Sequence, residues 1–270
     1  MNKTITKRLL SLVLLVVMLV GCALPAYAVD TGASGDLTAA YALRGTAYKD
    51  GVYEGTGKGF KDGEIKVKVT ITDGKITDNH VTNGNGGAIY VEAGGTLNLY
   101  GGEISGNNGN KSGGAIFLNK TDNKGGTVNM YGGTIANNTA QKGGVIYSEC
   151  GGTINLAGGT ISGNKATNGD GGGINMAGGT VTISGAKLTG NTSSQYGGAV
   201  YLYNGVTATM TGGEISSNQA ASEGGAVHVY GTSTFNLSGG KITGNSSVDG
   251  GAIYLNREPS VLNMSGGVIS

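Results

Sequence analysis

Short runs in which apolar and polar residues alternate recur along most of the chain, separated by glycine-rich turns. One set of three runs has apolar residues at alternate positions: Ile89 and Val91, then Leu97 and Leu99, then Ile104. Alternation with a period of two predicts β-strands that turn one face toward a core. The set restarts at Gly-Gly pairs, whose first members are Gly86, Gly113, Gly143, Gly171, Gly197, Gly224 and Gly250. Such a period is typical of a solenoid, in which each coil buries its apolar face against the next.

The three runs of each repeat predict one coil of a right-handed parallel β-helix, so the predicted fold class is all-β. Equivalent runs align in register over residues 83–270, which gives about six to seven coils, and the last repeat stops within its phrase at Ser270. Neighbouring coils would stack about 4.8 Å apart, the strand spacing of any sheet. Right-handed winding is predicted because left-handed β-helices show strict six-residue repeats, which this chain lacks.

The composition of the chain argues against collagen, a disordered chain and a nucleic-acid-binding protein. Glycine accounts for 55 of the 270 residues and proline for only 2, so the three-residue, proline-rich period of collagen is absent. The repeats are rich in Ile, Val and Thr, which disordered chains lack. The formal net charge is +1 without basic runs, and nucleic acid is therefore not predicted as a partner.

One asparagine follows the third run of every complete repeat. We predict that these residues form an outward-facing structural ladder, because asparagine tolerates the left-handed conformation of a tight turn and its amide can bond the amide of the next coil. The ladder consists of Asn107, Asn138, Asn164, Asn191, Asn218 and Asn245. Threonines and further asparagines align on the second run; they predict a stabilising sheet surface, with a glycan- or ice-binding face as the alternative.

Aromatic residues align at one outward position of the first run. These are Tyr90, Phe117, Tyr147, Tyr201 and Tyr254, with Asn175 and His228 at the same position in the other two coils. Stacked aromatic rings stabilise neighbouring strands, and they also offer a platform for sugar rings or a protein partner. This column is the candidate ligand face.

The beginning of the chain predicts export. Residues 1–28 have a charged start, an apolar run too short to span a membrane, and two competing cleavage patterns. Cleavage after Ala28 would release the protein, whereas the Leu-Val-Gly-Cys pattern would lipidate Cys22 and anchor it to a membrane. Either outcome places the protein outside the cytoplasm, secreted or on the cell surface. Residues 29–47 are small and polar and predict a linker.

Residues 48–82 predict a separate β module that caps the first coil. Residues 65–71 alternate as a strand, Asp73-Gly74 is a hairpin turn signal, and residues 75–77 start the return strand. The glycine- and tyrosine-rich stretch that opens this module makes residues 48–79 resemble the start of the bacterial FMN-binding domain. That resemblance implies FMN, but the family's Ser-Gly-Ala-Thr attachment motif is missing, so no cofactor is predicted and flavin binding is a second alternative.

The repeats at residues 84–270 resemble those of polymorphic outer-membrane proteins and pectate-lyase-like β-helix proteins. The resemblance rests on the recurring Gly-Gly-Ala-Ile and Gly-Gly-x-Ile-Ser-Gly-Asn phrases, as in residues 86–89 and 101–107. It implies an exported, adhesin-like protein that binds a host or environmental glycan or protein. The first alternative is a polysaccharide lyase or hydrolase with its site beyond Ser270. No catalytic or metal residues are predicted, because Asp122, Asp170 and Asp249 occur singly and Arg257 is the only arginine of the repeats.

Overall fold

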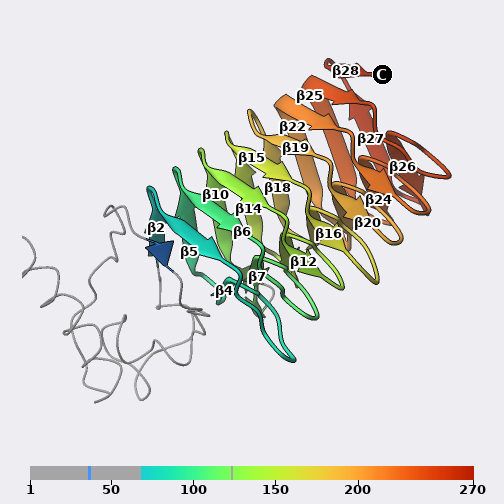
Figure 1. The fold of residues 1–270 in the computed structure, drawn as a ribbon. Coiled ribbons are helices and arrows are strands. Elements are labelled where there is room, and N and C mark those ends of the chain that lie inside the picture. Colours follow the sequence, from blue (N-terminus) through green and yellow to red (C-terminus); the bar gives the residue numbers. More distant parts are fainter. Residues whose placement is uncertain (1–35, 38–67, 123) are drawn as a thin grey trace, which may run out of the picture.

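The computed structural model describes residues 36–37, 68–122 and 124–270. These residues form a β-solenoid of about seven turns that starts near residue 69, which confirms the predicted all-β parallel β-helix. Figure 1 shows the coils following one another along a single axis, from β2 at one end to β28 at the other. None of the described residues belongs to a helix long and apolar enough to cross a membrane.

The first strands of the coils form a seven-stranded parallel sheet. Its members are β4 (Ile89–Val91), β7 (Ile116–Leu118), β13 (Ile146–Ser148), β17 (Ile174–Ala177), β21 (Val200–Tyr203), β24 (Val227–Tyr230) and β26 (Ile253–Asn256). Each strand pairs with the strand one repeat later, so equivalent residues such as Ile146 and Ile174 are direct neighbours. The repeat of the sequence therefore determines the register.

The second and third strands of the coils belong to one 15-stranded sheet. The second strands are β2 (Lys68–Ile71), β5 (Thr96–Leu99), β10 (Thr127–Met130), β14 (Thr153–Leu156), β18 (Thr180–Ile183) and β27 (Val261–Met264). The third strands are β3 (Lys75–Thr77), β6 (Glu103–Ser105), β11 (Thr134–Ala136), β15 (Thr160–Ser162), β19 (Lys187–Thr189) and β28 (Val268–Ile269). In two coils both strands merge into one, β22 (Thr207–Ser216) and β25 (Thr234–Thr243).

Shorter strands complete the coils. A four-stranded sheet follows the asparagine positions and consists of β12 (Thr139–Ala140), β16 (Lys165–Ala166), β20 (Thr192–Ser193) and β23 (Gln219–Ala220). The longest repeat accommodates its extra residues in an antiparallel pair, β8 (Lys120–Thr121) and β9 (Lys124–Gly125).

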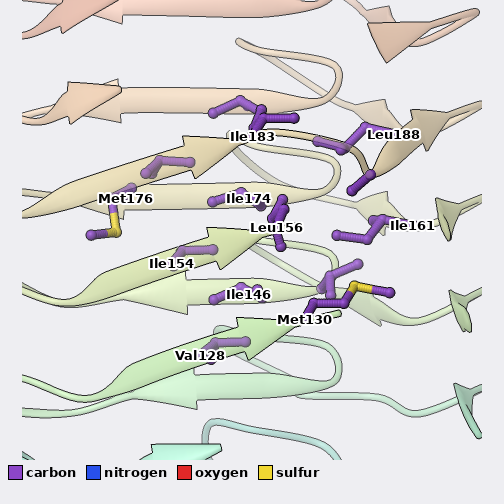
Figure 2. Close-up of a cluster of buried hydrophobic side chains, with 14 of the residues drawn as sticks. Val128, Met130, Ile146, Ile154, Leu156, Ile161, Ile174, Met176, Ile183 and Leu188 are labelled. Carbon is purple, nitrogen blue, oxygen red and sulfur yellow. The ribbon is translucent and has the colours of Figure 1, made fainter. Parts of the chain in front are cut away.

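The core runs along the inside of the coils. Figure 2 shows equivalent apolar side chains stacked from coil to coil, such as Val128 with Ile154 and Ile146 with Ile174. Ile135, Ile161 and Ile242 are fully buried, as are most residues at the predicted core positions. Each fully buried aliphatic side chain stabilises the fold by about 1.5–3 kcal/mol, a gain that depends on the adjacent coil being present.

The Gly-Gly pairs are required by backbone geometry. Gly143 has a φ of +61°, a region that glycine enters without strain. A Cβ on Gly144 would lie 2.2 Å from the carbonyl oxygen of Gly172, so the second glycine of the pair allows the backbones of two coils to meet.

The predicted hairpin is wrong. β2 and β3 do not pair with each other; β2 pairs in parallel with β5, and β3 with β6. Asp73-Gly74 therefore occupies the turn that Gly101-Gly102 occupies in the next coil, and the solenoid begins with β2 rather than at residue 83. The part of the FMN-like segment that the structure describes, from residue 68 onward, belongs to this first coil.

The remaining N-terminal predictions fall outside the described residues. These are the leader (1–28) with Cys22, residues 48–67, and the linker (29–47) apart from β1 (Asp36–Leu37). β1 pairs in parallel with β3, so two residues of the predicted linker extend the large sheet.

Candidate functional site

The outer face of the seven-stranded sheet carries the predicted aromatic column. The strand register aligns Tyr90, Phe117, Tyr147, Asn175, Tyr201, His228 and Tyr254, which we call the aromatic column. These residues alternate with core residues such as Ile146 and Ile174, so their side chains point away from the core. The structure thus brings all five predicted ligand-face residues onto one surface.

The rings of the aromatic column form two stacks. In the first stack, the ring centroids of Tyr90 and Phe117 are 5.0 Å apart and those of Phe117 and Tyr147 are 5.7 Å apart. In the second, His228 lies 5.1 Å from Tyr201 and 5.3 Å from Tyr254. These distances suit offset or tilted aromatic packing. Asn175 separates the two stacks.

A second column lies beside the aromatic column, at the residue before each Gly-Gly pair. We call it the turn column: Asn85, Ser112, Lys142, Asp170, Tyr196, Glu223 and Asp249. Three of its members contact the aromatic column. The Tyr196 ring lies 5.0 Å from the His228 ring in a tilted arrangement, Glu223 Oε2 lies 3.0 Å from His228 Nε2, and the Asp170 carbonyl accepts from Asn175.

A third column lies at the end of each strand. We call it the end column: Glu92, Asn119, Glu149, Ala177, Tyr203, Tyr230 and Asn256. The hydroxyls of Tyr203 and Tyr147 share a hydrogen bond of 3.1 Å that crosses the coil of Asn175 and Ala177. Ala177 is only 2% exposed, although it is on the outer face. Arg257 lies over the Tyr230 ring, 5.2 Å from its centroid.

His228 is the most buried polar residue of this surface, with none of its area exposed. Burial lowers the pKa of its imidazole, and the carboxylate of Glu223 opposes that shift. A neutral ring that donates Nε2–H to the carboxylate leaves Nδ1 as an acceptor, and Nδ1 has no hydrogen-bond partner.

Asp170 and Asn175 form a second buried polar group. Asn175 Nδ2 donates to the backbone carbonyl of Asp170 at 3.2 Å, while Oδ1 of each residue has no partner. Burial raises the pKa of the Asp170 carboxyl, and Lys142 and the backbone N–H of Tyr196 partly offset the shift. Burial also raises the pKa of the Tyr201 and Tyr203 hydroxyls, so both stay protonated and able to donate.

The predicted asparagine ladder lies elsewhere, inside the solenoid. Asn107, Asn138, Asn164, Asn191 and Asn218 are buried, so the prediction that they face outward is wrong. Each amide bonds the next: Asn138 Nδ2 donates to Asn164 Oδ1 at 3.0 Å, and Asn218 Nδ2 reaches Asn245 Oδ1 at 2.9 Å. These side chains are occupied by structural hydrogen bonds.

The ladder asparagines themselves do not adopt the predicted left-handed conformation. The left-handed residue of the turn precedes the asparagine and is, in order, Asp78, Gly106, Asn137, Gly163, Gly190, Ser217 or Gly244. Asn79 is a further ladder member that was not predicted, and its amide donates to Asn107 Oδ1 at 2.9 Å. The phrase Ile76-Thr-Asp-Asn79 could have revealed it.

The outer face of the 15-stranded sheet is the alternative surface. Asn129 Nδ2 donates to Asn98 Oδ1, and Asn155 Nδ2 donates to Asn129 Oδ1, whereas the buried Nδ2 of Asn98 has no hydrogen-bond partner. Tyr100 and Tyr131 stack at 4.6 Å at its edge and are 52% and 47% exposed. This face consists mainly of threonine and asparagine columns, and it has fewer acidic and aromatic side chains than the outer face of the seven-stranded sheet.

Sequence reasoning missed the turn and end columns, above all Tyr196, Tyr203, Tyr230 and Glu223. Aligning the positions before each Gly-Gly pair and at the end of each first run would have exposed them. Within the described ranges, no three His, Cys, Asp or Glu side chains lie close enough to hold a metal ion.

Comparisons of the chain with protein-family models, curated proteins and solved structures found no match. The arrangement of its own side chains therefore carries the functional argument.

Proposed function

We propose that this chain is an exported, adhesin-like β-solenoid protein that binds carbohydrate through the outer face of its seven-stranded sheet. The observation that supports the proposal most is the aromatic column, whose tyrosine rings are partly exposed and lie between two columns rich in polar side chains. Sugar-binding surfaces need flat apolar platforms together with convergent hydrogen-bonding groups. The Tyr147, Tyr201 and Tyr254 rings supply the platforms here, and the turn and end columns supply the polar groups.

Glycan is favoured over a protein partner because the polar groups of this face are incompletely paired. Asp170, Asn175 and His228 each have a buried acceptor without a donor. A polyhydroxylated ligand brings many donors to a surface of this kind, whereas protein–protein contacts are centred on apolar anchors.

The location of the protein is part of the proposal. The charged and apolar leader at residues 1–28 supports export, and the repeats resemble those of polymorphic outer-membrane and pectate-lyase-like proteins. Mass spectrometry of the mature N-terminus distinguishes the two anchoring modes. A lipidated Cys22 supports a membrane-anchored surface protein, and an N-terminus at Val29 supports a released one.

A glycan array combined with matched tyrosine variants tests the binding proposal. Tyr201→Ala removes a platform from the aromatic column, and Tyr100→Ala removes an exposed tyrosine from the other sheet. We expect Tyr201→Ala to weaken binding to array hits by about tenfold or more, with Tyr100→Ala unchanged. Binding to no glycan by folded protein, or equal losses in both variants, contradicts the proposal.

Polysaccharide cleavage is a second candidate function, favoured by one observation. Asp170 and Glu223 are both on the turn column, two coils and so about 9.6 Å apart along the axis. Inverting glycosidases use two carboxyl groups at a comparable separation, one of them with a raised pKa, and burial raises the pKa of Asp170. Release of reducing ends that Glu223→Gln abolishes supports cleavage, and an unchanged polymer contradicts it.

A further inference from the structure

Every unpartnered buried polar atom in the three columns is an acceptor. Asp170 Oδ1 and Asn175 Oδ1 have no donor, and neither has Nδ1 of the neutral His228 ring. A buried polar atom without a hydrogen bond destabilises a protein, so the presence of each such atom needs a specific explanation. Because the atoms share one face and one chemical character, a ligand rich in hydrogen-bond donors provides a common reason.

The charge of this surface selects among donor-rich ligands. Its three columns contain the carboxylates Glu92, Glu149, Asp170, Glu223 and Asp249, and the lysine Lys142. Arg257 adds a second cation at the edge, over Tyr230. The excess of carboxylates repels uronates and sulfated glycans and attracts a cationic ligand.

We propose that the ligand is a polymer of de-N-acetylated amino sugars, and that Asp170 and Asn175 take up one of its ammonium groups. This inference rests on the proposed carbohydrate binding. An ammonium has three donors and no acceptor, which matches a carboxylate oxygen and an amide oxygen that both lack donors. The neighbouring tyrosine rings attract the same positive charge through their faces.

A hydroxyl–hydroxyl hydrogen bond crosses the coil that carries Asn175. It joins Tyr147 to Tyr203, and Asn175 is only 1% exposed. Both tyrosine side chains are half-buried, so we expect a ligand to reach Asn175 after one of these rings rotates, with sugar hydroxyls replacing the hydroxyl–hydroxyl bond.

A calcium ion fits the same position less well than an ammonium. Calcium takes six to eight oxygen ligands and usually several carboxylates, and Asp170 is the one carboxylate of this group. No metal-binding cluster of His, Cys, Asp or Glu occurs among the residues that the structure describes.

Calorimetric titration with two matched oligosaccharides tests the inference. A hexamer of β-1,4-linked glucosamine and its fully N-acetylated counterpart share ring geometry and hydroxyls and differ in the ammonium. We expect the glucosamine hexamer to bind at least about tenfold more tightly, because only its ammonium can form a charge-assisted hydrogen bond with Asp170. Asp170→Asn should reduce this preference to about threefold or less. Glu214→Gln removes a carboxylate from β22 of the large sheet, outside the three columns, and is the control that should retain the preference.

A salt series on the unmodified protein gives a second readout that does not depend on a variant folding. The preference for the glucosamine hexamer should shrink with rising salt, because salt screens the attraction between the carboxylate-rich surface and the cationic oligosaccharide.

The outcomes separate the inference from the proposed function. Equal affinity for the two hexamers, or a preference that Asp170→Asn leaves intact, overturns the ammonium assignment while carbohydrate binding stands. Binding that disappears with EDTA and returns with calcium overturns it in favour of a metal. Failure of both hexamers and of every arrayed glycan overturns both.

Discussion

Asn164 and Asn175 are in consecutive coils and are almost equally buried, at 0% and 1% exposure, yet their hydrogen bonding differs. Asn164 is inside the solenoid. Its Nδ2 donates to the carbonyls of Ile135 and Ser162 and to Asn191 Oδ1, and its own Oδ1 accepts two bonds from Asn138. Asn175 is on the outer face, makes one bond to Asp170, and leaves Oδ1 without a donor.

The difference shows two uses of a buried amide. The ladder amides satisfy backbone groups of adjacent coils, so they hold the solenoid together and have no capacity left for a ligand. The Asn175 amide, by contrast, makes one hydrogen bond within the protein and leaves its oxygen without a donor. Buried polar atoms that the fold does not satisfy are candidates for recognition. Among the described residues six such side-chain atoms occur, and three of them, on Asp170, Asn175 and His228, lie on the aromatic face.

The largest effect is expected from Asn164→Ala, which removes a ladder amide. Several buried groups, including the Ile135 carbonyl and the Asn138 N–H, would lose their partners, so the free energy of unfolding should fall by about 3–4 kcal/mol. Asn175→Ala is the matched control and should cost about 1 kcal/mol or less. Urea unfolding followed by circular dichroism measures both, and equal losses would erase the distinction between the two amides.

His228→Phe should change how stability depends on pH. The folded pKa of His228 lies below the ordinary 6.5, so the unfolded chain binds the extra proton and the wild-type free energy of unfolding falls as pH drops below 6.5. The slope approaches about 1.4 kcal/mol per pH unit until the folded pKa is reached. Phenylalanine already occupies the aromatic column at Phe117, so the variant should fold and lose this slope. Unfolding midpoints measured across acidic pH decide it, and an unchanged slope contradicts the burial of a neutral histidine.

Asp170→Asn should have a smaller effect of opposite pH dependence. The folded pKa of Asp170 lies above the ordinary 3.8, so the folded chain holds the proton longer and wild-type stability falls as pH rises through that interval. The asparagine variant lacks this loss and should match or exceed the wild type at neutral pH by up to about 1 kcal/mol. If the variant is instead less stable at neutral pH, the Asp170 carboxylate stabilises the fold, and it is not a buried charge that lacks a partner.

The smallest effect is expected from Asn129→Thr, on the outer face of the 15-stranded sheet. Asn129 exchanges bonds with Asn98 and Asn155 at a half-exposed position, and Thr182 and Thr209 occupy the same position in later coils. The free energy of unfolding should stay within about 0.5 kcal/mol of the wild type. A loss of unfolding free energy comparable to that of Asn164→Ala would show that the exposure of an asparagine column does not determine how much the column stabilises the fold.

Much of the fold follows from the repeats, because equivalent residues such as Ile146 and Ile174 must pair when each coil repeats the last. The errors have local causes. Asp73-Gly74 is a strong hairpin signal by itself, and its true role appears only when Ile76 is aligned with Ile104. The left-handed residue before each ladder asparagine breaks the alternation of the strand and turns the amide inward, which a period-two pattern cannot register.

The candidate site was less predictable than the fold. The aromatic column could be read from the register of Tyr147 and Tyr201. The turn column could not, because its members differ in type from coil to coil and stand outside the strands. The contacts of Tyr196 and Glu223 with His228 depend on how the turn folds over the sheet.

The central claim is that the aromatic face of the seven-stranded sheet, and not the Thr- and Asn-rich face of the large sheet, meets the ligand. Hydrogen–deuterium exchange with and without the glucosamine hexamer tests it most directly. The account predicts slower exchange in β13, β17, β21 and β24 and in the turns that carry Asp170, Tyr196 and Glu223, with β10, β14 and β18 unchanged. Slowed exchange confined to the large sheet, with the seven-stranded sheet unaffected, would contradict it.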